Sequence, residues 1–170
     1  GDLLDLSRIE SGGTVHNIQS VQLEELLSSI VDFLGSRSKA KQQQLSLELG
    51  QSDFPEITAD PLALESIFGN LITNAINYTG EGGQIQVEMD RVADGLQVKV
   101  ADNGFGIERR HDEKIFEKFY RVKDENTRFI TGTGLGLPIV KGLVEKMNGT
   151  ITLESAPGEG SVFTVTLPVK

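Results

Sequence analysis

Three asparagines, Asn70, Asn74 and Asn77, recur at helical spacing in the segment NLITNAINY. At about 100° per residue they share one flank of a helix, beside its apolar stripe. Asparagine is a mediocre helix former because its carboxamide competes for backbone hydrogen bonds. Neutral amide oxygens suit Mg²⁺, which prefers oxygen ligands and retains waters and substrate phosphates. The structural alternative is that these carboxamides cap neighbouring loops.

A glycine cluster, TGTGLGL, places Gly132, Gly134 and Gly136 directly before an apolar run. Such a loop presents the free N–H groups and the positive dipole end of the following helix to an anion. The segment lacks the Lys-Ser or Lys-Thr of a P-loop, and the preceding strand and βαβ unit of a dinucleotide-binding fold. It indicates a phosphate loop of another kind or, alternatively, a tight glycine turn without a ligand.

A carboxylate follows an alternating strand in VADNGFGI, where Asp102 precedes Gly104 and Gly106. At a strand end, with glycines that let a flat ligand lie close, this carboxylate can accept a hydrogen bond from an amine on a ring. The alternative is an ordinary Asn-Gly turn.

Two aromatic residues and a cation stand close together in KIFEKFYR, namely Phe116, Phe119 and Arg121. Together they are typical of a hinged lid with an apolar anchor and a cation for phosphate. The alternative is that the aromatic side chains only pin a loop to the core.

The elements that must position these residues follow from apolar periodicity. We expect an α+β fold, a mixed sheet with helices on one side, with a long polar stretch from Asp102 to Thr131. Helices are expected from an N-cap at Ser20 through Leu34, from Asp60-Pro61 through the asparagines, and from Leu135 to Met147 with Asn148-Gly149 as C-cap. Strands are expected at 14–19, 45–49, 85–89, 96–100, 151–153 and 163–167, the middle and last pairs as hairpins.

Composition excludes several classes of protein. The chain of 170 residues has no cysteine, which rules out disulfides and cysteine metal sites and fits a reducing compartment. Its net charge of −9 argues against a nucleic-acid binder. It lacks a run of 18 apolar residues, so we expect no membrane contact by this chain and a cytoplasmic location, with the full-length protein either free or membrane-anchored.

The four motifs resemble, in order and spacing, the N, G1, F and G2 boxes of sensor histidine kinases: NLITNAINYT, DNGFGI, IFEKFYRV and GTGLGLPIV. LLDLSRIESG is similar to the end of that family's dimerisation helix hairpin, and GSVFTVTLP to its closing strand. The resemblance implies a Bergerat-type ATP-binding fold, a two-layer α/β sandwich with a mostly antiparallel sheet on about three helices. Residues 1–12 would be a remnant of the dimerisation and phosphoacceptor helix, and 13–170 the catalytic domain.

The resemblance also implies a role for each motif residue. Asn74 would be the Mg²⁺ ligand, with Asn70 assisting phosphate or metal placement and Arg121 reaching the phosphates; these three are the expected catalytic residues. Asp102 would receive the adenine amino group, and Ser161 would contact the adenine side through water. The full set of expected nucleotide contacts is Asn70, Asn74, Asn77, Tyr78, Asp102, Gly104, Gly106, Ile107, Phe119, Arg121, Thr131, Gly132, Thr133, Gly134, Leu135, Gly136, Leu137 and Ser161.

Two positions depart from the family pattern. Many members carry Lys or Arg where this chain has Asn77, so a phosphate contact would be lost. The phosphoaccepting histidine is also absent, because neither His16 nor His111 has the helical His-Glu or His-Asp context of an acceptor. We therefore expect this chain to bind ATP and Mg²⁺ but not to autophosphorylate alone.

The implied function is transfer of the ATP γ-phosphoryl group to a histidine on a dimerisation domain, within a two-component signalling system. The implied partners are ATP or ADP, the helix hairpin of the same protein or its dimer mate, and a response regulator acting through the full-length protein. The alternatives are an ATPase or serine kinase of the same fold, or an inactive nucleotide-binding interaction module.

Overall fold

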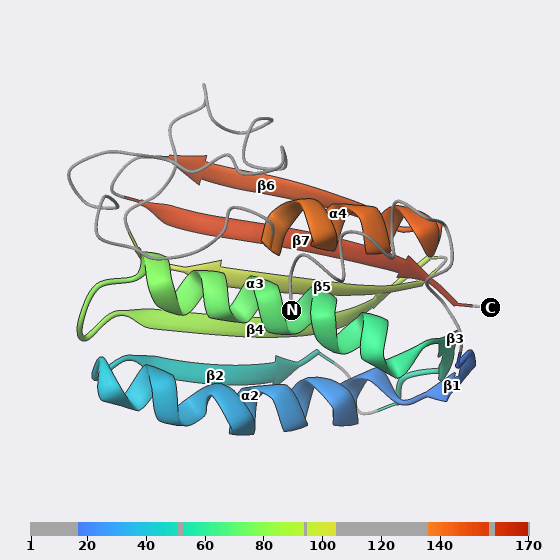
Figure 1. The fold of residues 1–170 in the computed structure, drawn as a ribbon, viewed down its shortest axis with the longest axis horizontal. Helices are drawn as coiled ribbons and strands as arrows, with labels where there is room; N and C mark the ends of the chain where they lie inside the picture. Colours follow the sequence, from blue (N-terminus) through green and yellow to red (C-terminus); the bar gives the residue numbers. More distant parts are fainter. Residues whose placement is uncertain (1–16, 51–52, 94, 105–135, 157–158, 170) are drawn as a thin grey trace.

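The computed structural model describes residues 17–50, 53–93, 95–104, 136–156 and 159–169. They form two layers, a five-stranded sheet with helices packed on one face (Figure 1). The helices are α2 (Leu23–Ala40), α3 (Pro61–Tyr78) and α4 (Gly136–Lys146). The strands are β1 (Gln19–Val21), β2 (Gln44–Leu49), β3 (Ile57–Ala59), β4 (Gln84–Val92), β5 (Gly95–Asp102), β6 (Thr150–Ala156) and β7 (Gly160–Pro168). The predicted α+β sandwich is confirmed.

The sheet has the strand order β2-β4-β5-β7-β6. Only β2 and β4 pair in parallel, and the other three pairs are antiparallel. The β4–β5 and β6–β7 hairpins expected from alternating apolar residues are both present. In this register Asp102, at the end of β5, lies opposite Ser161, at the start of β7.

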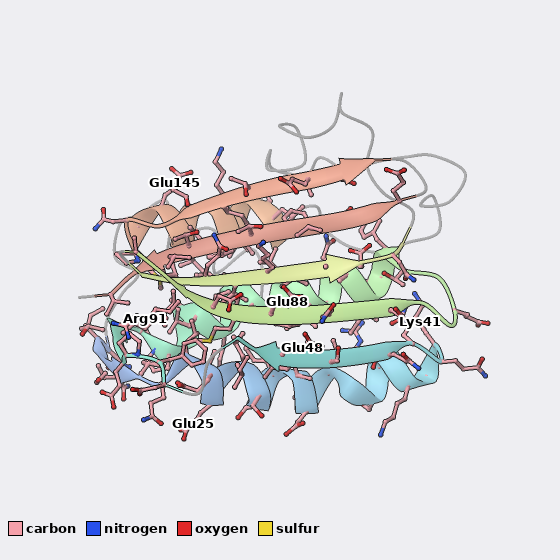
Figure 2. All side chains as sticks on the ribbon, turned by 180° about the vertical axis from the view of Figure 1, so that it is seen from behind. Glu25, Lys41, Glu48, Glu88, Arg91 and Glu145 are labelled. Carbon is pink, nitrogen blue, oxygen red and sulfur yellow. The ribbon has the colours of Figure 1, made fainter. Side chains whose placement is uncertain are left out.

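The core lies between the sheet and the helices. The central helix α3 buries one face completely, with Leu64, Ile67, Phe68 and Leu71 all at zero exposure, as its apolar spacing predicts. The opposite face of the sheet carries polar side chains, including Glu48 and Glu88, which pair in register (Figure 2). The sheet is therefore covered by helices on one side only.

The helix starts test the predicted caps. The Asp60-Pro61 start is confirmed, because the Asp60 carboxylate accepts a hydrogen bond from Leu62 N at 3.0 Å. The Ser20 cap is wrong: α2 begins at Leu23, and Ser20 lies within β1, where its hydroxyl donates to the Glu56 carboxylate. Pairing with β3 holds residues 19–21 extended, so that β1 ends two residues beyond the end of the strand expected over 14–19.

The end of α4 confirms the predicted Asn148-Gly149 cap. Asn148 adopts the left-handed conformation with φ of 60°, and Gly149 N donates to Val144 O at 2.9 Å. None of the helices in the described ranges is both long enough and apolar enough to cross a bilayer.

Candidate nucleotide-binding site

Part of the predicted site lies at one end of the sheet, where α3 and β5 end and β7 begins (Figure 1). Asn74, Asn77 and Tyr78 occupy the last turns of α3, and Asp102 and Ser161 face each other across β5 and β7. Gly136 is the first residue of α4, and the half-buried Leu137 packs on the core. The remaining predicted residues fall outside the described ranges: Gly106, Ile107, Phe116, Phe119, Arg121, Thr131, Gly132, Thr133, Gly134 and Leu135.

Asp102 is held in place by its backbone neighbours. Its Oδ1 accepts a hydrogen bond from Gly104 N at 2.9 Å, and the carboxylate also accepts from the backbone N–H of Ser161. Burial raises the pKa of Asp102 to about 6, against the lowering effect of these two hydrogen bonds. The strand end thus presents a fixed, partly desolvated carboxylate, a suitable acceptor for an amine donor on a ligand.

This raised pKa predicts how the stability of the domain depends on pH. Because folding raises the pKa of Asp102 from 3.8 to about 6, the stabilisation from its protonated form is present below pH 4 and lost as the pH rises through 6. Asp102→Asn mimics the protonated group and does not titrate. As the pH rises from 4.5 to 7.5, its free energy of unfolding should therefore increase relative to that of the wild type, by on the order of 2 kcal/mol. Denaturant unfolding of both proteins at the two pH values measures this; a relative gain at the lower pH would contradict it.

Gly104 and Gly160 allow backbone segments to approach at the same end of the sheet. A Cβ on Gly104 would lie 2.1 Å from Tyr78 O, so the chain leaving β5 packs directly on the end of α3. Gly160 has φ of +83°, and a Cβ there would lie 1.9 Å from Asp102 O. Gly104 therefore has a packing role between β5 and α3. Gly160 has a similar role between β7 and β5, and it was not among the predicted site residues.

The three asparagines differ in their hydrogen bonding. Asn70 turns its amide back onto its own helix, with Nδ2 donating to Ser66 O at 2.6 Å. Asn74 and Asn77 are half-buried, and within the described ranges their carboxamides make no hydrogen bond. The Asn74 oxygen is therefore available to a ligand, while the Asn70 amide is engaged within its own helix and not with a neighbouring loop.

The donor set at this end fits a metal that arrives with phosphate. The described part of the chain contains no group of three or more His, Cys, Asp or Glu side chains able to hold a metal ion. A single amide oxygen from Asn74 suits Mg²⁺, which takes few protein ligands and completes its octahedral shell with phosphate oxygens and water.

Two residues of this end were missed by the sequence reasoning: Lys41 and Gln43, between α2 and β2. Gln43 is only 6 % exposed, and its Nε2 donates to Ile76 O at 3.1 Å and to Thr79 O at 2.8 Å. Lys41 Nζ donates to Ile76 O at 2.8 Å. Desolvation lowers the pKa of Lys41, and Glu81 partly counters this. These donors satisfy carbonyls at the end of α3, where the helix has no basic residue of its own.

Comparison with known proteins places this geometry in a family. Residues 59–170 match the model of the histidine kinase-, DNA gyrase B- and HSP90-like ATPases. Among curated proteins, the chain is 34% identical over 172 residues to the sensor histidine kinase WalK of Bacillus subtilis, and 33% identical over 170 residues to the sensor-like histidine kinase SenX3 of Mycolicibacterium smegmatis. Each match covers 99% of this chain, but only 28% and 43% of those proteins.

Solved structures of histidine kinases share this fold. The catalytic domain of the histidine kinase ThkA superposes with a TM-score of 0.79 at 27% identity, covering 91% of this chain and 97% of that domain. Full-length ShkA in complex with AMPPNP gives a TM-score of 0.83 at 27% identity, covering 99% of this chain and 34% of ShkA. The chain therefore belongs to the family of histidine kinase-, DNA gyrase B- and HSP90-like ATPases, as a catalytic ATP-binding domain of the sensor histidine kinase type.

Proposed function

We propose that this domain binds ATP with Mg²⁺ and transfers the γ-phosphoryl group to a histidine on the dimerisation hairpin of its full-length protein or of a dimer mate. The observation that carries the proposal is the Asp102 carboxylate, fixed at the end of β5 beside the end of α3. The AMPPNP complex of ShkA supports a triphosphate ligand. The proposal places the domain in a two-component system, with a response regulator receiving the phosphoryl group.

The proposed roles of the residues follow from the chemistry of phosphoryl transfer, which needs positioning and charge neutralisation more than covalent catalysis. Asp102 accepts from the adenine amino group and sets the register of the nucleotide. Asn74 offers its oxygen to Mg²⁺, which neutralises phosphate charge when bound. Arg121 and the N–H groups of the glycine loop hold the γ-phosphate, and Asn70 assists in placing it.

The acceptor supplies the nucleophile. A neutral imidazole nitrogen of the hairpin attacks the γ-phosphorus, and the bond to the β,γ-bridging oxygen breaks to release ADP. The other imidazole nitrogen then loses its proton to solvent. Because neutral imidazole is already nucleophilic, this domain needs no strong base of its own. The remaining predicted contacts, from Asn77 and Tyr78 on α3 to Ser161 on β7, would line the nucleotide without entering the reaction.

The test mixes the domain with a separately made hairpin that carries an acceptor histidine, in γ-labelled ATP and Mg²⁺. We expect acid-labile label on the hairpin and none on this domain alone. Asn74→Ala should slow the Mg²⁺-dependent transfer at least tenfold, whereas Thr73→Ala, its neighbour on α3, should leave it near wild type. Release of free phosphate without transfer would instead identify an ATPase, and no heat of ATP binding in calorimetry would identify an inactive module.

A further inference from the structure

The outer face of α2 carries a row of side chains that is separate from the buried face of the helix. Its members recur at alternating spacings of three and four residues and are Leu26, Ser29, Phe33, Ser36 and Ala40. Phe33 is 81% exposed, Leu26 is half-buried, and the other three are exposed. Alternation of three and four residues is typical of the contact seam between two helices that pack along each other. We call these five residues the α2 seam.

Phe33 is the most exposed large hydrophobic residue in the described ranges. Among the described elements, only α3 flanks α2 within the helical layer, and α2 forms the edge of that layer (Figure 1). Phe33 lines a groove of about 630 Å³ between the two helices, together with Ser66 and Gly69 of α3. Aromatic side chains are enriched at protein interfaces, where they act as anchors. An exposed phenylalanine in a helical seam therefore indicates a contact surface for another helix.

The seam is complementary to itself when a second copy of the chain lies antiparallel to the first. A two-fold axis at the level of Val31 places Phe33 opposite Ser29 of the second copy, and Leu26 opposite Ser36. Each large side chain then faces a small one, so the two helices can approach closely. In a parallel pair, Phe33 would face Phe33 and serine would face serine, and the layers would not be matched in size.

The charges of α2 favour the same antiparallel orientation. Its first turn carries Glu24 and Glu25, and its last turn carries Arg37 and Lys39. Glu25 stands on the outer side of α2, away from the strands (Figure 2). The antiparallel register brings Glu25 beside Lys39 of the second copy, and the two-fold axis repeats this pair. The same register brings the two exposed Asp32 side chains together near the axis, which weakens the association.

We propose that the α2 seam is the contact surface of a two-fold symmetric dimer, in which α2 packs antiparallel against α2 of a second copy of this chain. With one helix of 18 residues from each copy, the contact is smaller than a standard interface, so we expect a weak dimer with a Kd on the order of 100 µM. None of the seam residues is a predicted nucleotide contact. The inference is independent of the proposed phosphoryl transfer, and its test uses no nucleotide.

Sedimentation equilibrium of the chain at concentrations up to about 1 mM tests the dimer, and a Kd in this range is expected for the wild type. Phe33→Ser changes a side chain that is already in water, so it should keep the fold and raise the Kd at least about tenfold. Leu62→Ser removes another exposed hydrophobic side chain, at the start of α3, and should dimerise as the wild type does. A wild type that stays monomeric, or equal Kd values for the two variants, would overturn the proposal.

Charge reversal tests the orientation of the two helices. Glu25→Lys and Lys39→Glu each place like charges at both pairs, so each should raise the Kd about fivefold at low salt. The double variant Glu25→Lys/Lys39→Glu restores opposite charges and should return the Kd to near the wild-type value. Asp32→Asn should lower the Kd, because it removes the repulsion near the axis. Additive weakening in the double variant would rule out the antiparallel pairing.

Crosslinking locates the axis, because the chain has no cysteine and single thiols can be introduced. Asp32→Cys brings two thiols near the axis, within reach of a short bismaleimide. Thr152→Cys, an exposed position on β6 and remote from α2, is the matched control. We expect crosslinked dimers of Asp32→Cys to form at least about fivefold faster, since proximity raises the effective concentration of the thiols. Equal rates for the two variants would show that α2 does not pair with itself.

Discussion

Replacing Asp102 with asparagine should weaken ATP binding by 10- to 100-fold at pH 7.5. A hydrogen bond to a charged acceptor contributes about 1.5–3 kcal/mol, and here the carboxylate is already fixed by Gly104 N and the Ser161 N–H before the nucleotide arrives. An asparagine amide can also turn its NH₂ toward the ligand and favour a ring carbonyl. The variant should therefore lose much of its preference for ATP over GTP.

Calorimetry with ATP, GTP and inorganic triphosphate separates a base contact from general damage to the site. If Asp102 recognises adenine, triphosphate should bind the variant and the wild type equally. Glu88→Gln, on the open face of the sheet, is the matched loss of a carboxylate and should bind ATP as wild type does (Figure 2). Equal weakening of triphosphate binding in Asp102→Asn would show that the residue supports the fold of the site and does not read the base.

Local sequence patterns were sufficient to predict those elements in which a single segment carries its own buried, apolar face. The apolar spacing of α3, together with Asp60-Pro61 at its start, places its core residues correctly. The β4–β5 hairpin likewise follows from alternation on both sides of a tight turn. In these elements, the residues that determine the structure are neighbours in the sequence.

Long-range pairing was not predictable in the same way. The strand β3 has three residues, too few for a periodic signal, and it holds Ser20 in an extended strand only because β1 pairs with it across more than thirty residues. Gln43 stands in a run of three glutamines with no pattern of its own. Its burial follows from the meeting of the α2–β2 connection with the end of α3.

The candidate site combines motifs that were predictable from the sequence with long-range contacts that were not. The motifs containing Asn74 and Asp102 were evident from residue type and spacing, and the fold brings the end of α3 and the end of β5 together at Gly104. What the motifs did not show is how the chain maintains this meeting. Gly83 N–H donates to Gly80 O, and the backbone N–H of Gln44 donates to Gly83 O, so the turn after α3 is tied to the start of β2.

Gln43 is therefore expected to contribute to stability more than any other polar residue near the site. Its Nε2 lies within hydrogen-bonding distance of three carbonyls, those of Ile76, Thr79 and Gly80. The Ile76 carbonyl also accepts from Lys41 Nζ, and the Gly80 carbonyl also accepts from Gly83 N. Gln43→Leu leaves the Thr79 carbonyl without its donor, at about 1–3 kcal/mol, and removes one of two donors from Ile76 O and Gly80 O. It also removes the Gln43 Oε1 atom, which is itself buried without a partner. A net loss of about 2 kcal/mol follows, or a melting temperature lower by roughly 4–8 °C.

Thermal and denaturant unfolding of Gln43→Leu, Gln43→Glu and Gln44→Leu should show a definite order. Gln43→Glu places a carboxylate against three carbonyl oxygens, so its loss of stability should exceed that of Gln43→Leu at pH 7.5 and diminish at acidic pH, where a protonated carboxyl can donate. Gln44→Leu changes the exposed neighbour and should be near neutral. If Gln43→Leu were as stable as Gln44→Leu, the carbonyls at the end of α3 would not depend on Gln43, and Asn77 and Tyr78 would owe their position to the packing of α3 alone.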